Sequence, residues 1–288
     1  MRATVKGSKL DGVTSERDDF ESVRRDPDPV RRGQRATKLL ALYQQRATEL
    51  ARLRKAAIDE ARDRGMTYTE VAEAFGLTKA RITQIRGSAP PAERAFFGIG
   101  PVTIALPVRM GVAERVRPVI AIEDAMTVDH LQALLLRLAF TVERAQIHHD
   151  EHDLPGRDAV IVCGPKSAPV VRLLLDEDPN LDMVNKNGRW WICDRRTDEC
   201  HGAPIDDTEP TTADLAYIAR HVRDDRTVVH IAGLHATGSL GAAHHLADHI
   251  GELYREVGSG ESFSMVIRCD LDGQDISATS VLVPPSIW

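Results

Sequence analysis

The sequence lacks any apolar run long enough to cross a bilayer, and residues 1–20 are polar throughout. A membrane-spanning helix needs about 20 predominantly apolar residues, and a secretory signal needs an apolar core near the amino terminus. We therefore expect no membrane partner and a cytoplasmic location.

Cysteine is also scarce, with only four residues in the chain, Cys163, Cys193, Cys200 and Cys269. Their spacing matches no disulfide framework, and the six residues between Cys193 and Cys200 exceed the usual short metal knuckle. The histidine-rich strings HHDEHD and HHLADH lack the zincin glutamate and fix no third ligand. The sequence thus predicts reduced thiols, no structural disulfide and no metal site, with HHDEHD in a surface loop.

Charge is present but unevenly distributed along the chain. Residues 1–95 contain 20 Lys and Arg against 14 Asp and Glu, whereas the remaining residues contain 17 against 29. A basic amino-terminal part gains affinity for nucleic acid through counterion release, and an acidic remainder is repelled by the same phosphates. We expect two functionally different domains.

Composition and periodicity divide the chain into four parts. The pattern predicts a mobile arm at residues 1–34, which contain the string DPDPV, and a helical domain at residues 35–88. It predicts a linker at residues 89–101 and an α/β domain at residues 102–288. Apolar residues from Ala36 to Gly65 predict one amphipathic helix of about thirty residues. Its apolar side could cover the helical domain alone, or could also pack on a second subunit or on the α/β domain.

The string TYTEVAEAFGLTKARITQIR, residues 67–86, is the most informative segment. It predicts two short helices joined at Gly76, with Leu77 filling the corner and Thr78 capping the second helix. The apolar positions expected to face the inside are Val71, Ala72, Phe75, Ile82 and Ile85. Lys79, Arg81, Thr83, Gln84 and Arg86 stay available for solvent or nucleic acid.

This segment resembles the helix-turn-helix of bacterial transcription regulators, and in particular region four of sigma factors. The resemblance covers about sixty residues at most. It implies that the second helix enters the major groove of double-stranded DNA. The residues that would then contact the DNA are Thr78, Lys79, Arg81, Thr83 and Gln84. The alternative is an amphipathic helical hairpin used only for packing.

The α/β domain is predicted from short Val- and Ile-rich runs separated by helical patterns. Strands are expected within residues 102–108, 118–124, 142–149, 158–164, 227–234 and 263–270, and helices near residues 128–140, 169–177, 213–223 and 239–257. Asn187-Gly188 and Asp272-Gly273 read as hairpin turns, so we expect a mixed sheet. Trp190 and Trp191 would point to opposite faces of one strand.

Two strand-to-helix junctions in this domain predict a cleft. One contains Gly164, Lys166 and Ser167, and the other contains Gly233, His235, Thr237, Gly238 and Ser239. Loops at the carboxyl ends of parallel strands gather on one edge of a sheet, where free amides at helix starts attract anions. The pattern resembles Rossmann-like nucleotide-binding domains and implies a nucleotide-like ligand, with Glu123 and Asp124 at the same edge. The alternative interpretation is that Gly164 and Gly233 form ordinary strand-to-helix turns without a ligand.

The sequence therefore predicts a DNA-binding transcription regulator, homodimeric, whose α/β domain senses a small nucleotide-like ligand or mediates dimerisation. No cofactor or catalytic residue is required. Two alternatives remain: an enzyme that acts on a nucleotide-like substrate and uses the helical region for targeting, and a sigma-like or scaffold partner of RNA polymerase.

Overall fold

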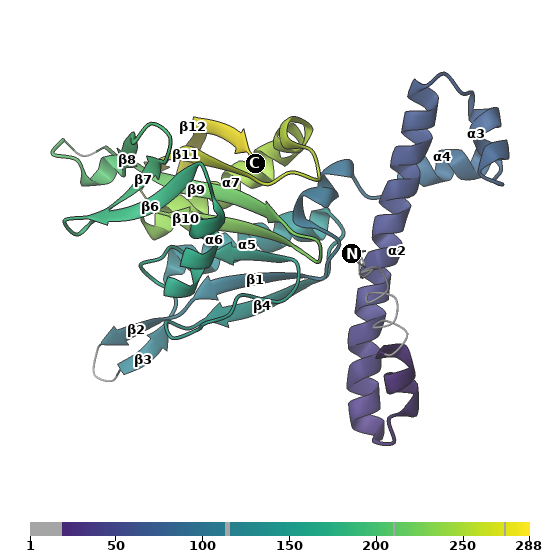
Figure 1. The fold of residues 1–288 in the computed structure, drawn as a ribbon, viewed down its shortest axis with the longest axis horizontal. Coiled ribbons are helices and arrows are strands. Elements are labelled where there is room, and N and C mark those ends of the chain that lie inside the picture. Colours follow the sequence, from purple (N-terminus) through teal and green to yellow (C-terminus); the bar gives the residue numbers. More distant parts are fainter. Residues whose placement is uncertain (1–18, 113–115, 210, 274) are drawn as a thin grey trace, which may run out of the picture.

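The protein has a long helix beside a mixed α/β unit (Figure 1). The computed structural model describes residues 19–288 except 113–115, 210 and 274. Helix α2 (Pro29–Asp63) carries α3 (Tyr68–Ala74) and α4 (Lys79–Ser88) at its carboxyl end. We call these two helices with the last turns of α2 the head, and residues 92–288 the body.

The long helix begins earlier than the sequence predicted. Asp28 caps α2 by accepting from the amides of Val30 and Arg31, and Pro29 occupies the first helical turn. The string DPDPV therefore contains the start of a helix. Residues 19–25 are also helical, so the predicted arm contains two helical segments within residues 19–34, while its residues 1–18 lie outside the described part of the chain.

The head has its own small apolar core. Ile58 of α2 packs with Val71 and Ala72 of α3 and with Ile82 and Ile85 of α4, as the apolar spacing predicted. Phe75 differs from the prediction, because it ends α3 at the turn and is 38% exposed.

Only part of the apolar side of α2 is covered. Within the described residues, α2 buries Gln45 and Arg52 toward the body and Ile58 toward the head. Leu40 and Leu50 are 58% and 66% exposed. The contact between α2 and the body is therefore largely polar.

The body is built on a seven-stranded mixed sheet in the order β12-β11-β9-β10-β5-β1-β4. Its strands are β1 (Val102–Pro107), β4 (Val142–Ile147), β5 (Ala159–Val162), β9 (Ala213–Val222), β10 (Thr227–Gly233), β11 (Phe263–Asp272) and β12 (Asp275–Ile287). β4, β1, β5 and β10 are parallel, and the remaining neighbours are antiparallel. The predicted mixed sheet and both predicted hairpin turns are confirmed.

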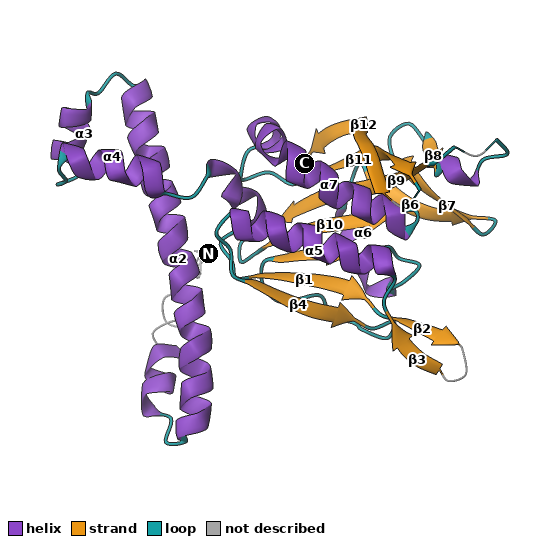
Figure 2. Ribbon diagram, turned by 180° about the vertical axis from the view of Figure 1, so that it is seen from behind, coloured by secondary structure: helices purple, strands orange, loops and turns teal. Residues whose placement is uncertain are grey.

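Two layers cover this sheet. Helices α5 (Ile122–Arg137) and α7 (Ala236–Val257) lie over one face (Figure 2) and enclose the largest apolar core. The other face carries the turn η2 (Pro169–Val171), α6 (Arg172–Glu177), and a small sheet of β6 (Leu181–Lys186), β7 (Arg189–Asp194) and β8 (Cys200–Gly202), which η3 (Pro204–Asp206) follows. A hairpin of β2 (Arg109–Val112) and β3 (Val116–Val119) extends beyond β1.

Two segments adopt a different secondary structure from the one predicted. Residues 213–222 form the strand β9 instead of a helix. β9 is buried along nearly its whole length, so its apolar residues lack the alternation that distinguishes a strand, and tertiary burial overrides the helix preference of its alanines. In the predicted strand 118–124, β3 ends at Val119 and α5 begins at Ile122.

The predicted linker is part of the body. Ala92–Phe97 forms the 3₁₀ helix η1, and Phe96 and Phe97 are fully buried in the core under the sheet. The residues after η1 are hydrogen-bonded to Asp158, whose Oδ2 accepts from the amides of Ile99 and Gly100 at 2.8 and 2.7 Å. Residues 92–101 are therefore packed and hydrogen-bonded as part of the body.

Arg94 of η1 joins α2 to the body. Its guanidinium donates to the carbonyls of Leu138 at 2.8 Å and Ile99 at 2.7 Å, and to Gln45 Oε1 at 2.9 Å. Gln45 Nε2 in turn donates to Thr141 Oγ1 at 3.1 Å. Burial lowers the pKa of Arg94 to about 10, so the group stays charged at neutral pH.

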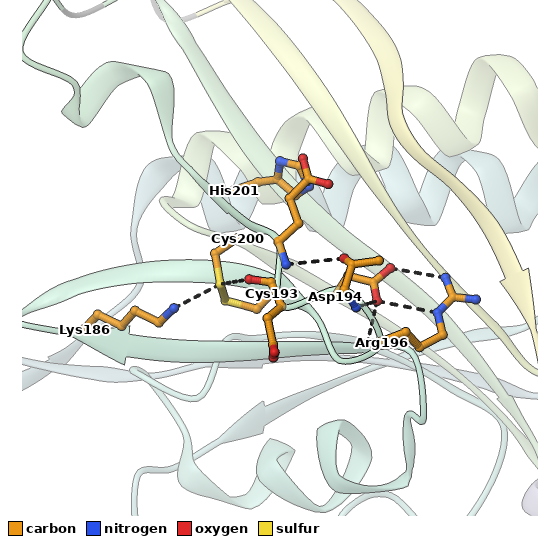
Figure 3. Close-up of a disulfide and its surroundings, with 9 residues drawn as sticks. Lys186, Cys193, Asp194, Arg196, Cys200 and His201 are labelled. Atoms are coloured by element: carbon orange, nitrogen blue, oxygen red, sulfur yellow. Dashed lines mark hydrogen bonds and ion pairs between the residues drawn. A yellow bond between two sulfur atoms is a disulfide. The ribbon is translucent and has the colours of Figure 1, made fainter.

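The prediction of no structural disulfide is wrong, because Cys193 and Cys200 are bonded (Figure 3). The antiparallel pairing of β7 and β8 sets the two residues directly opposite each other, with Cα atoms 4.0 Å apart. Asp194 folds the connecting turn by accepting from the amides of Arg196 and Thr197. Cys163 and Cys269 are free and buried.

Among the described residues, no helix combines the length and the apolar character that crossing a membrane requires.

Tyr217→Phe should lower the free energy of unfolding by about 1–3 kcal/mol. The Tyr217 hydroxyl donates to Asp178 Oδ2 at 2.8 Å in the apolar core between the large sheet and the small sheet, and the substitution leaves this buried carboxylate oxygen without its donor. Denaturant titration measures the change. Tyr43→Phe on α2 is the matched control and should have no effect; equal stability of both variants would contradict the prediction.

Candidate functional site

Two surfaces bring predicted site residues together, and the first is the exposed side of α4. Lys79, Arg81, Thr83 and Gln84 are all exposed. Arg81 Nη1 donates to Gln84 Oε1 at 2.6 Å, so these two side chains lie together. This side of α4 offers cationic, hydroxyl and amide groups to a partner.

Two of the predicted DNA-contact residues have structural roles. Thr78 caps α4, since its Oγ1 accepts from the amide of Arg81 at 3.2 Å. Arg86 donates to Asp59 on α2 at 2.9 Å and lies over the ring of Tyr68, which ties the end of α4 to the rest of the head.

The turn before α4 fixes the position of this helix. The amide of Leu77 donates to the carbonyl of Ala72 at 2.8 Å and that of Gly76 to Glu73 at 3.1 Å, which is the Schellman arrangement at a helix end. Gly76 has φ +66°, a conformation that side chains with a Cβ rarely adopt. The glycine is thus required by backbone conformation, since a Cβ there would meet no other atom.

The second surface is a cavity of about 880 Å³ at the carboxyl ends of β1, β5 and β10. From β1, the next parallel strand, β4, is added on one side, whereas β5 and then β10 are added on the other side. The direction in which strands are added to the sheet therefore reverses between β1 and β5. The lining includes both predicted junctions, with Gly164, Lys166, Ser167, Gly233, His235 and Ser239, together with Arg109, Asp124, His148, His149, Met183 and Trp190. Thr237 and Gly238 do not line it.

The start of α7 is partly capped by a carboxylate of the protein itself. Asp214, fully buried at the beginning of β9, accepts with Oδ2 from the amides of His235 and Gly238 at 3.1 and 2.7 Å and from Thr237 Oγ1 at 2.9 Å. Ser239 Oγ accepts from the amide of Gly233 at 3.0 Å. An internal carboxylate therefore occupies the place where we expected a ligand anion, and Gly233, Thr237, Gly238 and Ser239 shape the junction.

His235 lies between two carboxylates at the cavity. Its Nδ1 is 3.3 Å from Asp214 Oδ1, and its Nε2 is 3.4 Å from Asp206 Oδ1. The hydrogen bond to Asp214 raises the pKa of His235, against the opposing effect of burial. The arrangement favours a protonated imidazole at the wall of the cavity.

The opposite part of the cavity contains the pair Arg109 and Asp124. Arg109 Nη2 lies 3.3 Å from Asp124 Oδ2, and Arg109 Nε donates to Ser167 Oγ at 3.3 Å. Asp124, in the first turn of α5, is buried, and its Oδ2 accepts no hydrogen bond of good geometry. Burial raises the pKa of Asp124.

Sequence reasoning missed Arg109, His148, His149 and Trp190 at the cavity. The histidines follow β4 directly, so the rule that placed the Lys166 loop at the edge of the sheet could also have placed them there. Arg109 and Trp190 come from the two hairpins, whose position over the edge has no signal in the sequence.

No protein-family model matches this chain, and the comparison with curated proteins finds no match.

Gly76→Val should unfold or loosen the head while the body keeps its structure. The strain of a β-branched residue at positive φ is on the order of 1–3 kcal/mol, which is large for a core as small as that of the head. Limited proteolysis of the full chain should show faster cleavage within residues 66–88. Gly87→Ala, in the same head but without positive φ, is the control; a Gly76→Val protein as resistant as the control would refute the role of the turn.

The stability contribution of His235 should depend on pH. Because its folded pKa lies above the usual 6.5, the contribution is complete below about pH 6.5 and is lost as pH rises through the raised value. The difference in unfolding free energy between the native protein and His235→Gln should therefore shrink from pH 6 to pH 8.5. His148→Gln at the same cavity serves as control, and a constant difference for His235→Gln across this range would contradict the pairing.

Proposed function

We propose that the protein is a DNA-binding transcription regulator whose α/β body senses a small nucleotide-like ligand. The observation that supports this best is the head, in which α3, a glycine turn and α4 have the arrangement of a helix-turn-helix, with the polar side of α4 exposed. DNA contacts would come from Lys79, Arg81, Thr83 and Gln84.

The chemistry of α4 suits the major groove. Arginine and lysine pair with guanine and glutamine pairs with adenine, while threonine and lysine also bond phosphates. Arg81 and Gln84 already bond each other, so the free protein holds both side chains in one ordered arrangement.

The distribution of charge supports the orientation on DNA. The basic residues 1–95 include the head, whereas the acidic residues belong mostly to the body, which phosphates repel. This asymmetry favours a complex in which α4 faces the duplex and the body lies away from it.

The sensing role is supported by the position of the cavity. A reversal of strand order with a cavity at the carboxyl ends is where Rossmann-like sheets bind their ligands. Helix α5 begins at the cavity with Asp124, and the carbonyl of Leu138 just after its end accepts from Arg94, which also holds Gln45 of α2. A ligand that shifts α5 would thereby shift the helix that carries the head.

A homodimer would give two heads for two half-sites of an operator. The exposed Leu40 and Leu50 on α2 are apolar surface that a second subunit would cover.

A second candidate function is an enzyme acting on a nucleotide-like substrate at the same cavity. His235 supports it, because a histidine held by a buried aspartate is suited to general acid catalysis. Turnover of a nucleotide by the full chain, with loss of turnover in His235→Gln, would favour this candidate; binding without turnover would favour the sensor.

Arg81→Ala or Gln84→Ala should weaken specific DNA binding by about 1–3 kcal/mol and leave the fold unchanged, because both side chains point away from the head core. Operators recovered by selection from random DNA and then measured by fluorescence anisotropy provide the readout, and affinity should fall steeply with salt. Because the two residues bond each other, the double variant should lose less than the sum of the single ones.

Lys186→Ala, an exposed lysine on β6 of the body, is the control for this measurement. Unchanged affinity for Arg81→Ala, Gln84→Ala and Lys79→Ala together would exclude α4 as the DNA-reading helix.

A further inference from the structure

The cavity contains a lysine whose charge the protein leaves uncompensated. Lys166 is exposed at the cavity, and in the described part of the chain no carboxylate lies within ion-pair distance of it. Arg109 and His235, by contrast, each have a carboxylate partner. Lys166 is therefore the cation available to an anionic group of a ligand.

A second feature is the polar pair at the start of α5. Asp124 Oδ2 is buried without a hydrogen-bond donor of good geometry, although Arg109 lies 3.3 Å away. A buried carboxylate oxygen in this state is costly, and a ligand that brings an N–H or O–H group to Asp124 would relieve that cost. Arg109 offers N–H donors beside it, so the pair matches a polar edge that combines a donor and an acceptor.

A third feature is an aromatic wall. Trp190 on β7 lines the cavity together with Met183 on β6. Trp190 is half-buried against the core under the small sheet, while its neighbour Trp191 lies under the guanidinium of Arg189 and does not line the cavity. An indole ring at a cavity wall suits a planar heterocycle, because ring stacking adds to the burial of apolar surface.

The volume agrees with a ligand that reaches all three features. A cavity of about 880 Å³ lies within the range of about 300–1,000 Å³ that is typical of sites for small organic ligands. An inorganic anion alone would fill little of it.

We propose that the cavity binds a nucleoside phosphate, with its phosphate at Lys166, its base against Trp190 and a polar edge of the nucleoside at the Asp124–Arg109 pair. The ligand is held mainly by side chains, because Asp214 already accepts from the amides of His235 and Gly238 at the start of α7. This inference rests on the sensing half of the proposed function and names the class of ligand.

Calorimetric titration of the full chain tests the proposal with AMP, GMP, UMP and CMP, their nucleosides, and inorganic phosphate as probes. At least one nucleoside monophosphate should bind and raise Tm by mass action. The corresponding nucleoside should bind about tenfold more weakly or less, because it lacks the charge-assisted contact to Lys166. Inorganic phosphate should bind more weakly still.

Paired variants distinguish the contacts. Lys166→Ala should weaken the nucleotide about tenfold and leave the nucleoside unchanged, whereas Trp190→Leu should weaken both. Asp124→Asn should weaken both as well, and its nearly identical shape keeps the packing. The matched controls are Lys186→Ala and Trp191→Leu, which lie outside the cavity and should bind like the native protein.

The proposal is overturned if none of the nucleotides binds, if inorganic phosphate binds as tightly as the nucleotide, or if the cavity variants behave like their controls. DNA binding is measured on the same preparations. Loss of nucleotide binding with intact DNA binding would refute the ligand class alone, whereas nucleotide binding without any DNA binding would refute the regulator and leave the ligand class standing.

Discussion

The fully buried guanidinium of Arg94 is the interaction on which the arrangement of the protein depends. It needs several acceptors at once, and they come from three places in the chain: Gln45 on α2, the carbonyl of Ile99 before β1, and the carbonyl of Leu138 after α5. The ring of Phe140 lies 3.7 Å from its charge centre. A buried charge tolerates the loss of such partners poorly, so a shift of the body at any of these acceptors is expected to change the position of α2 as well.

The parts of the fold predicted from sequence are those in which local pattern and tertiary environment agree. Val71, Ile82 and Ile85 enter the head core as their spacing indicated, and β1, β4, β5 and β10 appear where Val and Ile cluster. Two of the wrong predictions, for β9 and for the linker, concern segments that are buried by residues far away in the chain. Ala213–Val222 is buried along nearly its whole length because both faces of β9 are covered, so its apolar residues do not alternate with exposed polar ones. Phe96 and Phe97 follow a proline-rich segment, and only the core that receives them shows that they belong to the body.

The candidate site shows the same limit. Sequence placed Lys166 and His235 at strand ends, and the sheet brings both to one cavity. It did not indicate that Asp214, some twenty residues before His235 in the chain, would neutralise the start of α7, since that depends on the antiparallel pairing of β9 with β10. The disulfide between Cys193 and Cys200 was missed for the same reason: strand pairing, and not spacing, sets the two thiols opposite each other.

Because α2 is long and contacts the body at Gln45, a small rotation of the helix about this residue moves the head over a larger distance. From Gln45 to Ile58, where the head is attached, a helix rises about 20 Å at 1.5 Å per residue. A tilt of α2 by about 10° at Gln45 therefore displaces the head by roughly 3.4 Å, which is the spacing between successive base pairs along a DNA strand. A rearrangement of the body too small to alter its fold would be enough to move α4 by one step along a duplex.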